Sequence, residues 1–205
     1  NSGRYRFLAN FERGAAAAGG EAEFFVYDPP AQASGEVTLW GQDAVLAAWL
    51  TKAGIRTRAF DQTRPGEPAD REVIVACGKP PVGGTADAMK GLVGCVRKGA
   101  TAIFLTPAIF SDGKDTTALL PLERRGRLTN LPSWLYHKDE WAKDHPVFAG
   151  LPAGGLMDYL VYRDIIPDTV FADLEAPAEA VAGANNAAVG YSSGLFAAVY
   201  RVGQG

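Results

Sequence analysis

The chain has 205 residues, of which 47% are hydrophobic and 21% are charged. This composition supports one globular domain with room for an appendage, and it is too apolar for a disordered chain. The formal net charge of -3 argues against a nucleic-acid-binding surface, which needs clustered Lys and Arg. No apolar run approaches the roughly 18–20 residues of a membrane-spanning helix. We therefore expect neither nucleic acid nor a membrane as partner.

The first 30 residues predict a β-hairpin. Apolar and polar side chains alternate in residues 5–10 and 21–26, and a turn rich in Gly and Ala separates the two runs. An isolated hairpin is marginal in water, so we expect it to pack on the main body or on a β-sandwich domain outside the chain. Residues 31–35 then predict a linker, directly after two prolines.

Both ends of the chain indicate a segment of a larger protein. The chain begins without Met, and residues 196–205 predict a strand and a turn towards a further strand. We interpret residues 1–30 as the end of a preceding domain. Residues 36–205 are expected to form an α/β domain that is truncated at its C-terminus.

Residues 36–107 alternate between strand-like and helix-like patterns. Short apolar runs predict strands, and between them apolar residues recur at helical spacing, with a glycine after each helix. The expected strands are 37–41, 55–60, 72–78 and 100–106, and the expected helices are 42–53 and 86–98. Short connections between such elements make right-handed βαβ units. The sequence therefore predicts an α/β fold with a flavodoxin-like or amidotransferase-like doubly wound, mostly parallel sheet.

Residues 108–205 are less regular. The aromatic stretch at 131–141 is compatible with a short helix. Strands are expected at 159–162, 187–191 and 196–202.

The two cysteines, Cys77 and Cys95, are too few for a disulfide scaffold and too far apart for a zinc knuckle. Both lie in apolar segments, which favours two buried free thiols. A single bridge stays open as an alternative in an exported protein.

The sequence predicts no catalytic residue. Cys77 ends an expected strand, where ligands of an open α/β sheet bind. A nucleophile elbow needs small residues on both sides of the nucleophile, and Val75 and Lys79 stand there instead, with Pro80 preventing a helix directly behind. His137 and His145 are the only histidines, and the acidic residues near them match no metal-ligand spacing. We expect no metal and no cofactor.

Aromatic side chains remain as candidates for ligand binding, because the apolar face of a pyranose ring packs on aromatic rings. Trp40, Trp134, Tyr136 and Trp141 could form such a platform, and plain packing explains them equally. The candidate binding residues are Trp40, Gln42, Trp134, His137 and Asp158.

Four segments carry a resemblance to a known family: 37–54, 73–78, 99–107 and 144–152. The last includes His145-Pro146 and Gly150-Leu151-Pro152, and it is similar to a His-Pro-x-x-x-Gly-Leu-Pro stretch in trehalose-utilisation-type proteins. Residues 36–205 thus resemble the class I glutamine amidotransferase-like superfamily. They look closest to the non-catalytic branch appended to bacterial glycoside hydrolases of the β-galactosidase or family-two type. The hairpin at 1–30 is similar to the last strands of an immunoglobulin-like domain.

The elbow cysteine and the catalytic histidine–glutamate pair of true amidotransferases have no counterparts here. The resemblance therefore does not imply that this chain hydrolyses amides. The resemblance implies a non-catalytic accessory domain of a glycoside hydrolase, active in carbohydrate metabolism and periplasmic or secreted. Its role would be interdomain packing, oligomer contact or sugar binding. The implied partners are other domains of the parent chain, a carbohydrate or a second copy.

Two other functions stay open. One is a stand-alone hydrolase acting on carbohydrate through a set such as His137, His145 and Asp158. The other is a flavodoxin-like module that binds a small ligand, which flavin absorbance in the purified protein would support.

Overall fold

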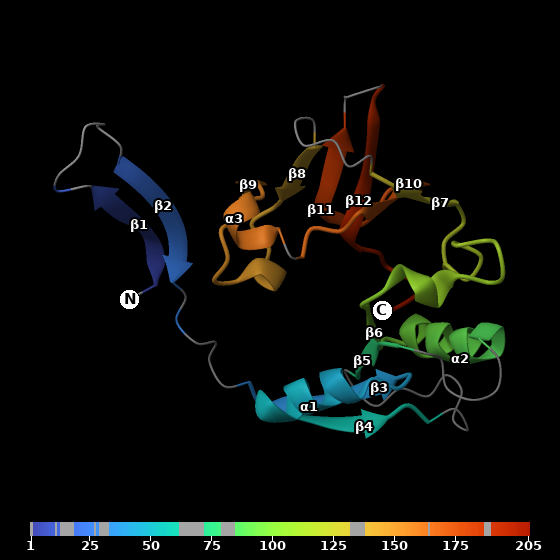
Figure 1. Ribbon diagram of the computed structural model, residues 1–205. Coiled ribbons are helices and arrows are strands. Elements are labelled where there is room, and N and C mark those ends of the chain that lie inside the picture. The colour runs from blue at the N-terminus through green and yellow to red at the C-terminus, as the bar shows by residue number, and fades with distance from the viewer. Residues whose placement is uncertain are drawn as a thin grey trace.

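A computed structural model describes residues 2–10, 12, 19–26, 28, 33–61, 72–78, 85–131, 138–163, 165–186 and 190–205. These residues form a two-stranded hairpin, a four-stranded sheet and a six-stranded sheet. The hairpin projects from the N-terminal end of the molecule, while the two larger sheets and their helices make up the body (Figure 1).

The hairpin consists of β1 (Gly3–Asn10) and β2 (Gly19–Val26), which pair antiparallel from Gly3 opposite Val26 to Asn10 opposite Gly19. Because side chains alternate between the two faces of a strand, this register separates them by polarity. One face carries only apolar side chains and glycines, and the other carries the arginines and glutamates. The hairpin is therefore amphipathic.

The four-stranded sheet is parallel and has the order β4-β3-β5-β6. Its elements are β3 (Gly35–Trp40), α1 (Ala44–Lys52), β4 (Ile55–Ala59), β5 (Val73–Ala76), α2 (Thr85–Arg97) and β6 (Thr101–Phe104). Since β4 and β6 are added at opposite edges, right-handed connections place α1 and α2 on opposite faces of this sheet. Asp43 begins α1 by accepting a hydrogen bond from the Leu46 amide, and Gly54 follows its end with a left-handed φ of 86°.

The main core of the body lies between this parallel sheet and α2. Trp40, Ile74 and Leu92 are fully buried there. The 3₁₀ helix η1 (Pro107–Phe110) closes the cluster, and Phe110 contacts Phe171 of the second sheet edge to face, with ring centroids 6.1 Å apart. This contact joins the two layers of the body.

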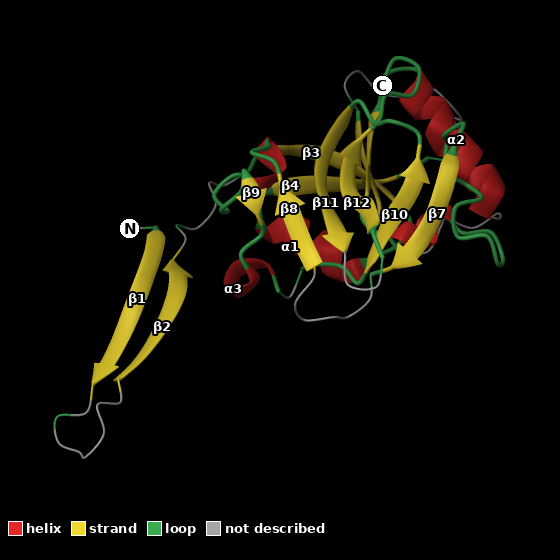
Figure 2. Cartoon of the chain, turned by 90° about the horizontal axis from the view of Figure 1, so that it is seen from above, coloured by secondary structure: helices red, strands yellow, loops and turns green. Residues whose placement is uncertain are grey.

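The six-stranded sheet is antiparallel and has the order β7-β10-β12-β11-β8-β9 (Figure 2). Its strands are β7 (Arg125–Asn130), β8 (Lys138–Ala142), β9 (Gly155–Leu156), β10 (Thr169–Leu174), β11 (Glu179–Asn186) and β12 (Ser192–Val199). The 3₁₀ helix η2 (Pro146–Phe148) and α3 (Tyr159–Tyr162) lie between strands in the chain. One face of the sheet buries Ala142 and Ala182 against Met157 and Tyr162.

The other face of this sheet carries a continuous cross-strand row. Each residue of the row is directly paired with the next, so all of them point to the same side. In strand order the row is Leu128, Phe171, Leu195, Gly183, Trp141 and Leu156.

The prediction of a doubly wound, mostly parallel, flavodoxin-like sheet is wrong for the chain as a whole. Parallel pairing is confined to β3–β6, and the larger sheet is antiparallel throughout. The physical reason is that residues after η1 supply strands that pair with each other and do not extend the parallel sheet. The N-terminal hairpin forms a separate sheet, joined to neither of the others.

Two smaller expectations also need correction, and a third falls largely outside the described residues. Residues 159–162 form the short helix α3 and not a strand, because the Asp158 side chain accepts the Leu160 amide hydrogen and so begins a helical turn. The second half of the stretch 131–141 is strand β8, whereas residues 132–137 lie outside the described residues. The strand expected at 187–191 falls largely on residues 187–189, which also lie outside them.

Both cysteines are buried free thiols, as the apolar segments around them predict. Among the described helices, none combines the length and the apolar character needed to cross a membrane.

Candidate functional site

The candidate site is a concavity of about 310 Å³ on the Trp141 face of the antiparallel sheet. Its apolar lining comes from the cross-strand row, through Trp141, Phe171 and Leu195. The segment after β10, Glu175 to Pro177, lines it as well. The concavity therefore lies on β10, β11, β12 and β8, outside the parallel sheet.

Glycine in the neighbouring strand makes room for the Trp141 indole. Gly183 of β11 is directly opposite Trp141, and a Cβ on Gly183 would lie 2.8 Å from the Trp141 Cζ2 atom. The same Cβ would lie 2.5 Å from the carbonyl oxygen of Gly194 on β12. A glycine inside a strand often marks such a close approach. The ring thus rests across the backbone of β11, where it lines the concavity.

The backbone at the end of β10 is unusual. Asp173 has a φ of 58°, the one left-handed φ outside glycine in the described residues. Gly126 of β7 has a φ of 55°, and a Cβ there would lie 2.1 Å from the Ala172 carbonyl oxygen. Asp173 lines the concavity and forms an ion pair with Arg127. Such irregularities in a strand pair occur often beside binding sites, because they re-aim a side chain.

Glu175 fixes the wall of the concavity. Its Oε2 accepts the amide hydrogens of Glu123 at 2.8 Å and Arg124 at 3.0 Å. Its carbonyl oxygen accepts a hydrogen bond from the Tyr200 hydroxyl at 3.1 Å. Burial, and then the Glu175 carboxylate, raise the pKa of Tyr200 above its ordinary value of 10.0. The Arg124 guanidinium donates to the Leu174 carbonyl oxygen at 2.9 Å, so the wall is held from both sides.

Two uncharged polar side chains complete the lining, Asn185 of β11 and Ser193 of β12. They are directly paired across the two strands and therefore point to the same side as Trp141 and Leu195. The Asn185 Oδ1 accepts a long hydrogen bond of 3.5 Å from the Tyr191 hydroxyl. Amide and hydroxyl groups at this place can both donate and accept hydrogen bonds.

The carboxyl end of β5, at one of the places where sequence reasoning expects ligands, is closed in the described residues. Cys77 is 1% exposed, and burial raises the pKa of its thiol above the ordinary value of 9.0, with a smaller contribution from the Asp43 carboxylate. Gly78 has a φ of 60°, and a Cβ there would lie 2.5 Å from the Gln42 carbonyl oxygen. The thiol is therefore protonated and covered, which is the reverse of an activated nucleophile.

The three predicted binding residues that the structure describes, Trp40, Gln42 and Asp158, do not come together. Trp40 is fully buried in the core, and its indole Nε1 has no hydrogen-bond partner in the described part of the chain. Gln42 is exposed next to the end of β3. Trp134 and His137 lie outside the described residues.

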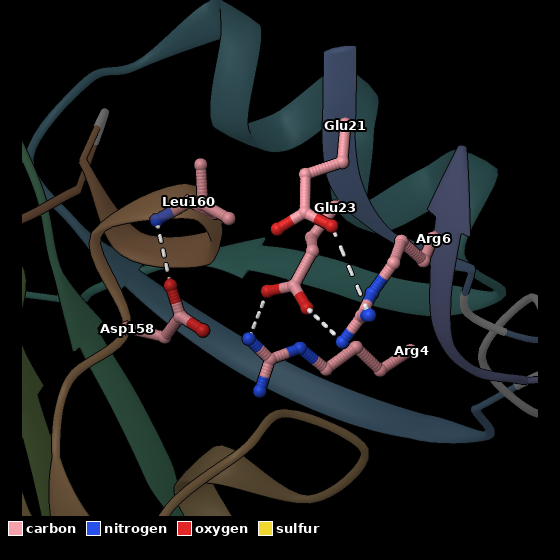
Figure 3. Close-up of polar contacts among 6 residues, drawn as sticks. All are labelled: Arg4, Arg6, Glu21, Glu23, Asp158 and Leu160. Carbon is pink, nitrogen blue, oxygen red and sulfur yellow. Dashed lines mark hydrogen bonds and ion pairs between the residues drawn. The ribbon is translucent and has the colours of Figure 1, made fainter. Parts of the chain in front are cut away.

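Asp158, the fifth candidate, lies beside the hairpin. Its carboxylate accepts the Leu160 amide hydrogen at 2.8 Å, and the Arg4 guanidinium extends towards it from β1 (Figure 3). A hydrogen bond from Arg4 to Glu23, the charge of Glu23 and, least, the charge of Asp158 raise the pKa of Arg4. Asp158 therefore caps α3 and faces the charged side of the hairpin.

His145 also has a structural role. Its Nδ1 accepts the Val147 amide hydrogen at 3.1 Å and so begins η2, and its Nε2 lies 3.8 Å from a Glu179 carboxylate oxygen. Within the described ranges, no group of three or more His, Cys, Asp or Glu side chains is arranged to hold a metal ion.

Sequence reasoning named Trp141 among the aromatic candidates but missed Asp173, Glu175, Asn185 and Ser193. Gly183 and Gly194 were a possible signal, because glycines inside strands mark close backbone approach, but neither lies in a strand that the sequence predicts. The partners of those glycines lie in other strands, and their pairing is not visible in the sequence.

Comparison of the chain with protein-family models, with curated proteins and with solved structures finds no match in any of the three. The resemblance to the amidotransferase-like superfamily therefore stays an expectation, and function must be argued from the site and the surfaces.

Proposed function

We propose that this chain is a non-catalytic accessory domain of a carbohydrate-active enzyme, a glycoside hydrolase, and that it docks on another domain of its parent protein. The observation that carries this proposal is the apolar face of the hairpin. Tyr5 and Phe24 stack on that face with ring centroids 5.7 Å apart, and Phe7 and Val26 extend it. All four side chains are exposed. A hairpin of two strands with such an exposed face is only marginally stable in water by itself.

The partner best suited to this apolar face is the second sheet of a β-sandwich. The strands are eight residues long, and their apolar side chains recur at every second position, as on the inner face of a sheet packed against another sheet. The charged face is turned towards the body, where Arg4 lies near Asp158 (Figure 3). The apolar face is exposed, and it carries no charge that would select a polar partner.

The absence of catalysis is supported by the state of Cys77. A covered thiol with a raised pKa is a poor nucleophile at neutral pH. The carbohydrate-active context is supported by the resemblance, and by the polar and aromatic lining of the concavity on the antiparallel sheet.

Docking is tested with Phe7→Ser and Leu8→Ser. Both side chains are 61% exposed, but they point to opposite faces of the hairpin. In the 205-residue chain the two substitutions should change the melting temperature by similar small amounts. In a longer protein that carries the proposed neighbouring domain, Phe7→Ser should cost about 3 kcal/mol, because it removes a buried ring, and Leu8→Ser should cost far less.

Equal effects in the longer protein would overturn the docking proposal, and so would a gene that encodes no sandwich domain next to this segment. Concentration-dependent association of the 205-residue chain that Phe7→Ser abolishes would replace the sandwich with a second copy. Catalysis is tested separately, with chromogenic glycosides and glutamine as substrates. Turnover by the purified chain at enzymatic rates would refute the non-catalytic role.

A further inference from the structure

The concavity on the antiparallel sheet combines an apolar floor with a polar rim. Trp141, Leu195 and Phe171 belong to one cross-strand row and form the floor. Asn185 and Ser193 project from the same face of the adjacent strands. Ligand sites are typically such concave surfaces, mostly apolar, with a few placed polar groups.

The charged residues of the lining already have hydrogen-bond or ion-pair partners within the protein. Arg124 donates to the Leu174 carbonyl oxygen, and the Glu175 carboxylate accepts two backbone amide hydrogens. Asp173 is paired with Arg127. The charged groups of the lining are thus of both signs, and each is already engaged in a contact within the protein. The groups left to select a ligand are the uncharged amide of Asn185, the hydroxyl of Ser193 and the indole of Trp141.

We infer that this concavity binds a neutral saccharide as a single pyranose ring. The apolar face of the sugar packs on Trp141, while Asn185 and Ser193 exchange hydrogen bonds with its hydroxyl groups. This inference rests on the proposed function, whose ligand and binding site it names.

The dimensions agree with one ring. The volume of about 310 Å³ lies at the lower end of the roughly 300–1,000 Å³ range of small-molecule sites. The wall at Glu175 is held by backbone amides and by Tyr200, so the site is formed before a ligand arrives. Preformed sites lose less conformational entropy on binding, which partly offsets the weak attraction of a neutral sugar.

The test is a calorimetric titration of the 205-residue chain with methyl β-D-galactopyranoside, methyl β-D-glucopyranoside and methyl α-D-mannopyranoside. At least one of them should bind, with an affinity that changes little with salt, because a neutral sugar forms no ion pair with the protein. Asn185→Ala and Trp141→Ala should each weaken binding by roughly tenfold or more. Trp141→Phe should retain part of the affinity, which separates ring stacking from misfolding.

Two matched controls lie outside the concavity. Trp49→Ala removes an exposed indole from α1, and Asn130→Ala removes an exposed amide from β7. Neither should change the affinity. Equal losses in the controls and in the site variants would overturn the inference.

Failure of all three glycosides to bind the folded chain would also overturn it. Salt-sensitive binding of galacturonate alone would replace the neutral sugar with an anionic ligand. Loss of the saccharide site leaves the hairpin result untouched, because the Phe7→Ser comparison measures stability and not ligand binding. The two proposals therefore fail separately.

Discussion

The two larger sheets of this protein use their faces differently. The parallel sheet buries large side chains, Trp40 and Ile74, under α2, and the end of β5 is closed around Cys77. The antiparallel sheet buries mainly alanines, such as Ala182 and Ala184, on one face and leaves a concavity around Trp141 on the other. The sheet that supplies most of the core is therefore not the one that supplies the candidate site.

The largest effect should come from the core of the parallel layer. Leu92→Ala removes a fully buried side chain from α2 and should lower the free energy of unfolding by about 3 kcal/mol, since it loses burial and leaves a cavity. Chemical denaturation measures this change. The control is Leu105→Ala, at a side chain that is 55% exposed, where the loss should stay below about 0.5 kcal/mol. Similar losses at both positions would mean that α2 does not pack as described.

Glycine-to-alanine substitutions should change the stability by smaller amounts, and the sign of the change should differ between the two layers. Gly183→Ala places a Cβ against the Gly194 carbonyl oxygen and the Trp141 ring, and should destabilise the antiparallel sheet by about 1–3 kcal/mol. Gly91→Ala in α2 meets nothing within 4 Å and should stabilise the helix by up to about 1 kcal/mol. Thermal melting distinguishes the two signs. A shifted tryptophan emission in Gly183→Ala would report the displaced indole.

The beginning of α1 should contribute about 1 kcal/mol through one side chain. Asp43→Ala removes the acceptor of the Leu46 amide hydrogen; the Leu46 nitrogen lies 2.9 Å from Asp43 Oδ1. Asp43→Asn keeps an acceptor at that place and should retain most of the stability. If the asparagine variant loses as much as the alanine variant, charge and not capping decides the effect.

The smallest expected effect is a loss of stability at high pH. Cys77 of the parallel layer contributes one part of it, and Tyr200, which follows the last strand of the antiparallel sheet, contributes the other. The folded protein raises the pKa of Cys77 above 9.0 and that of Tyr200 above 10.0. Because the folded state holds both protons more tightly than the unfolded state, the stabilisation is complete below those ordinary values. It is lost as pH rises through the raised ones.

Melting temperature against pH measures this loss. Cys77→Ala should remove the part that begins above about pH 9, and Tyr200→Phe the part that begins higher. An unchanged profile in both variants would contradict the burial of these groups.

The sequence predicts the strands and helices of the parallel layer well, because the signals that define them lie close together in the sequence. Its strands are short apolar runs, and Gly54 and Gly99 mark the helix ends to within a few residues. The antiparallel sheet is not predictable in the same way, since β7 pairs with β10 across about forty intervening residues. Strand β11 is also rich in alanine, which has a low β-propensity and weakens the alternating pattern.

The site is less predictable than the fold. Trp141 is visible as an aromatic residue, but its partners Asn185 and Ser193 join it only through strand register. The helical turn after Asp158 was missed for a related reason. Four apolar residues suit a strand or a helix equally, and the capping carboxylate decides between them.

Both thiols of the chain lie in the parallel layer, Cys77 after β5 and Cys95 in α2, and both are buried. A thiol reagent can react only when that layer opens, whereas local fraying of the antiparallel sheet leaves the reagent without a target. The rate of thiol labelling would therefore measure how often the parallel layer opens. Compared with amide hydrogen exchange over the whole chain, they would tell whether the two sheets open together or as separate cooperative units.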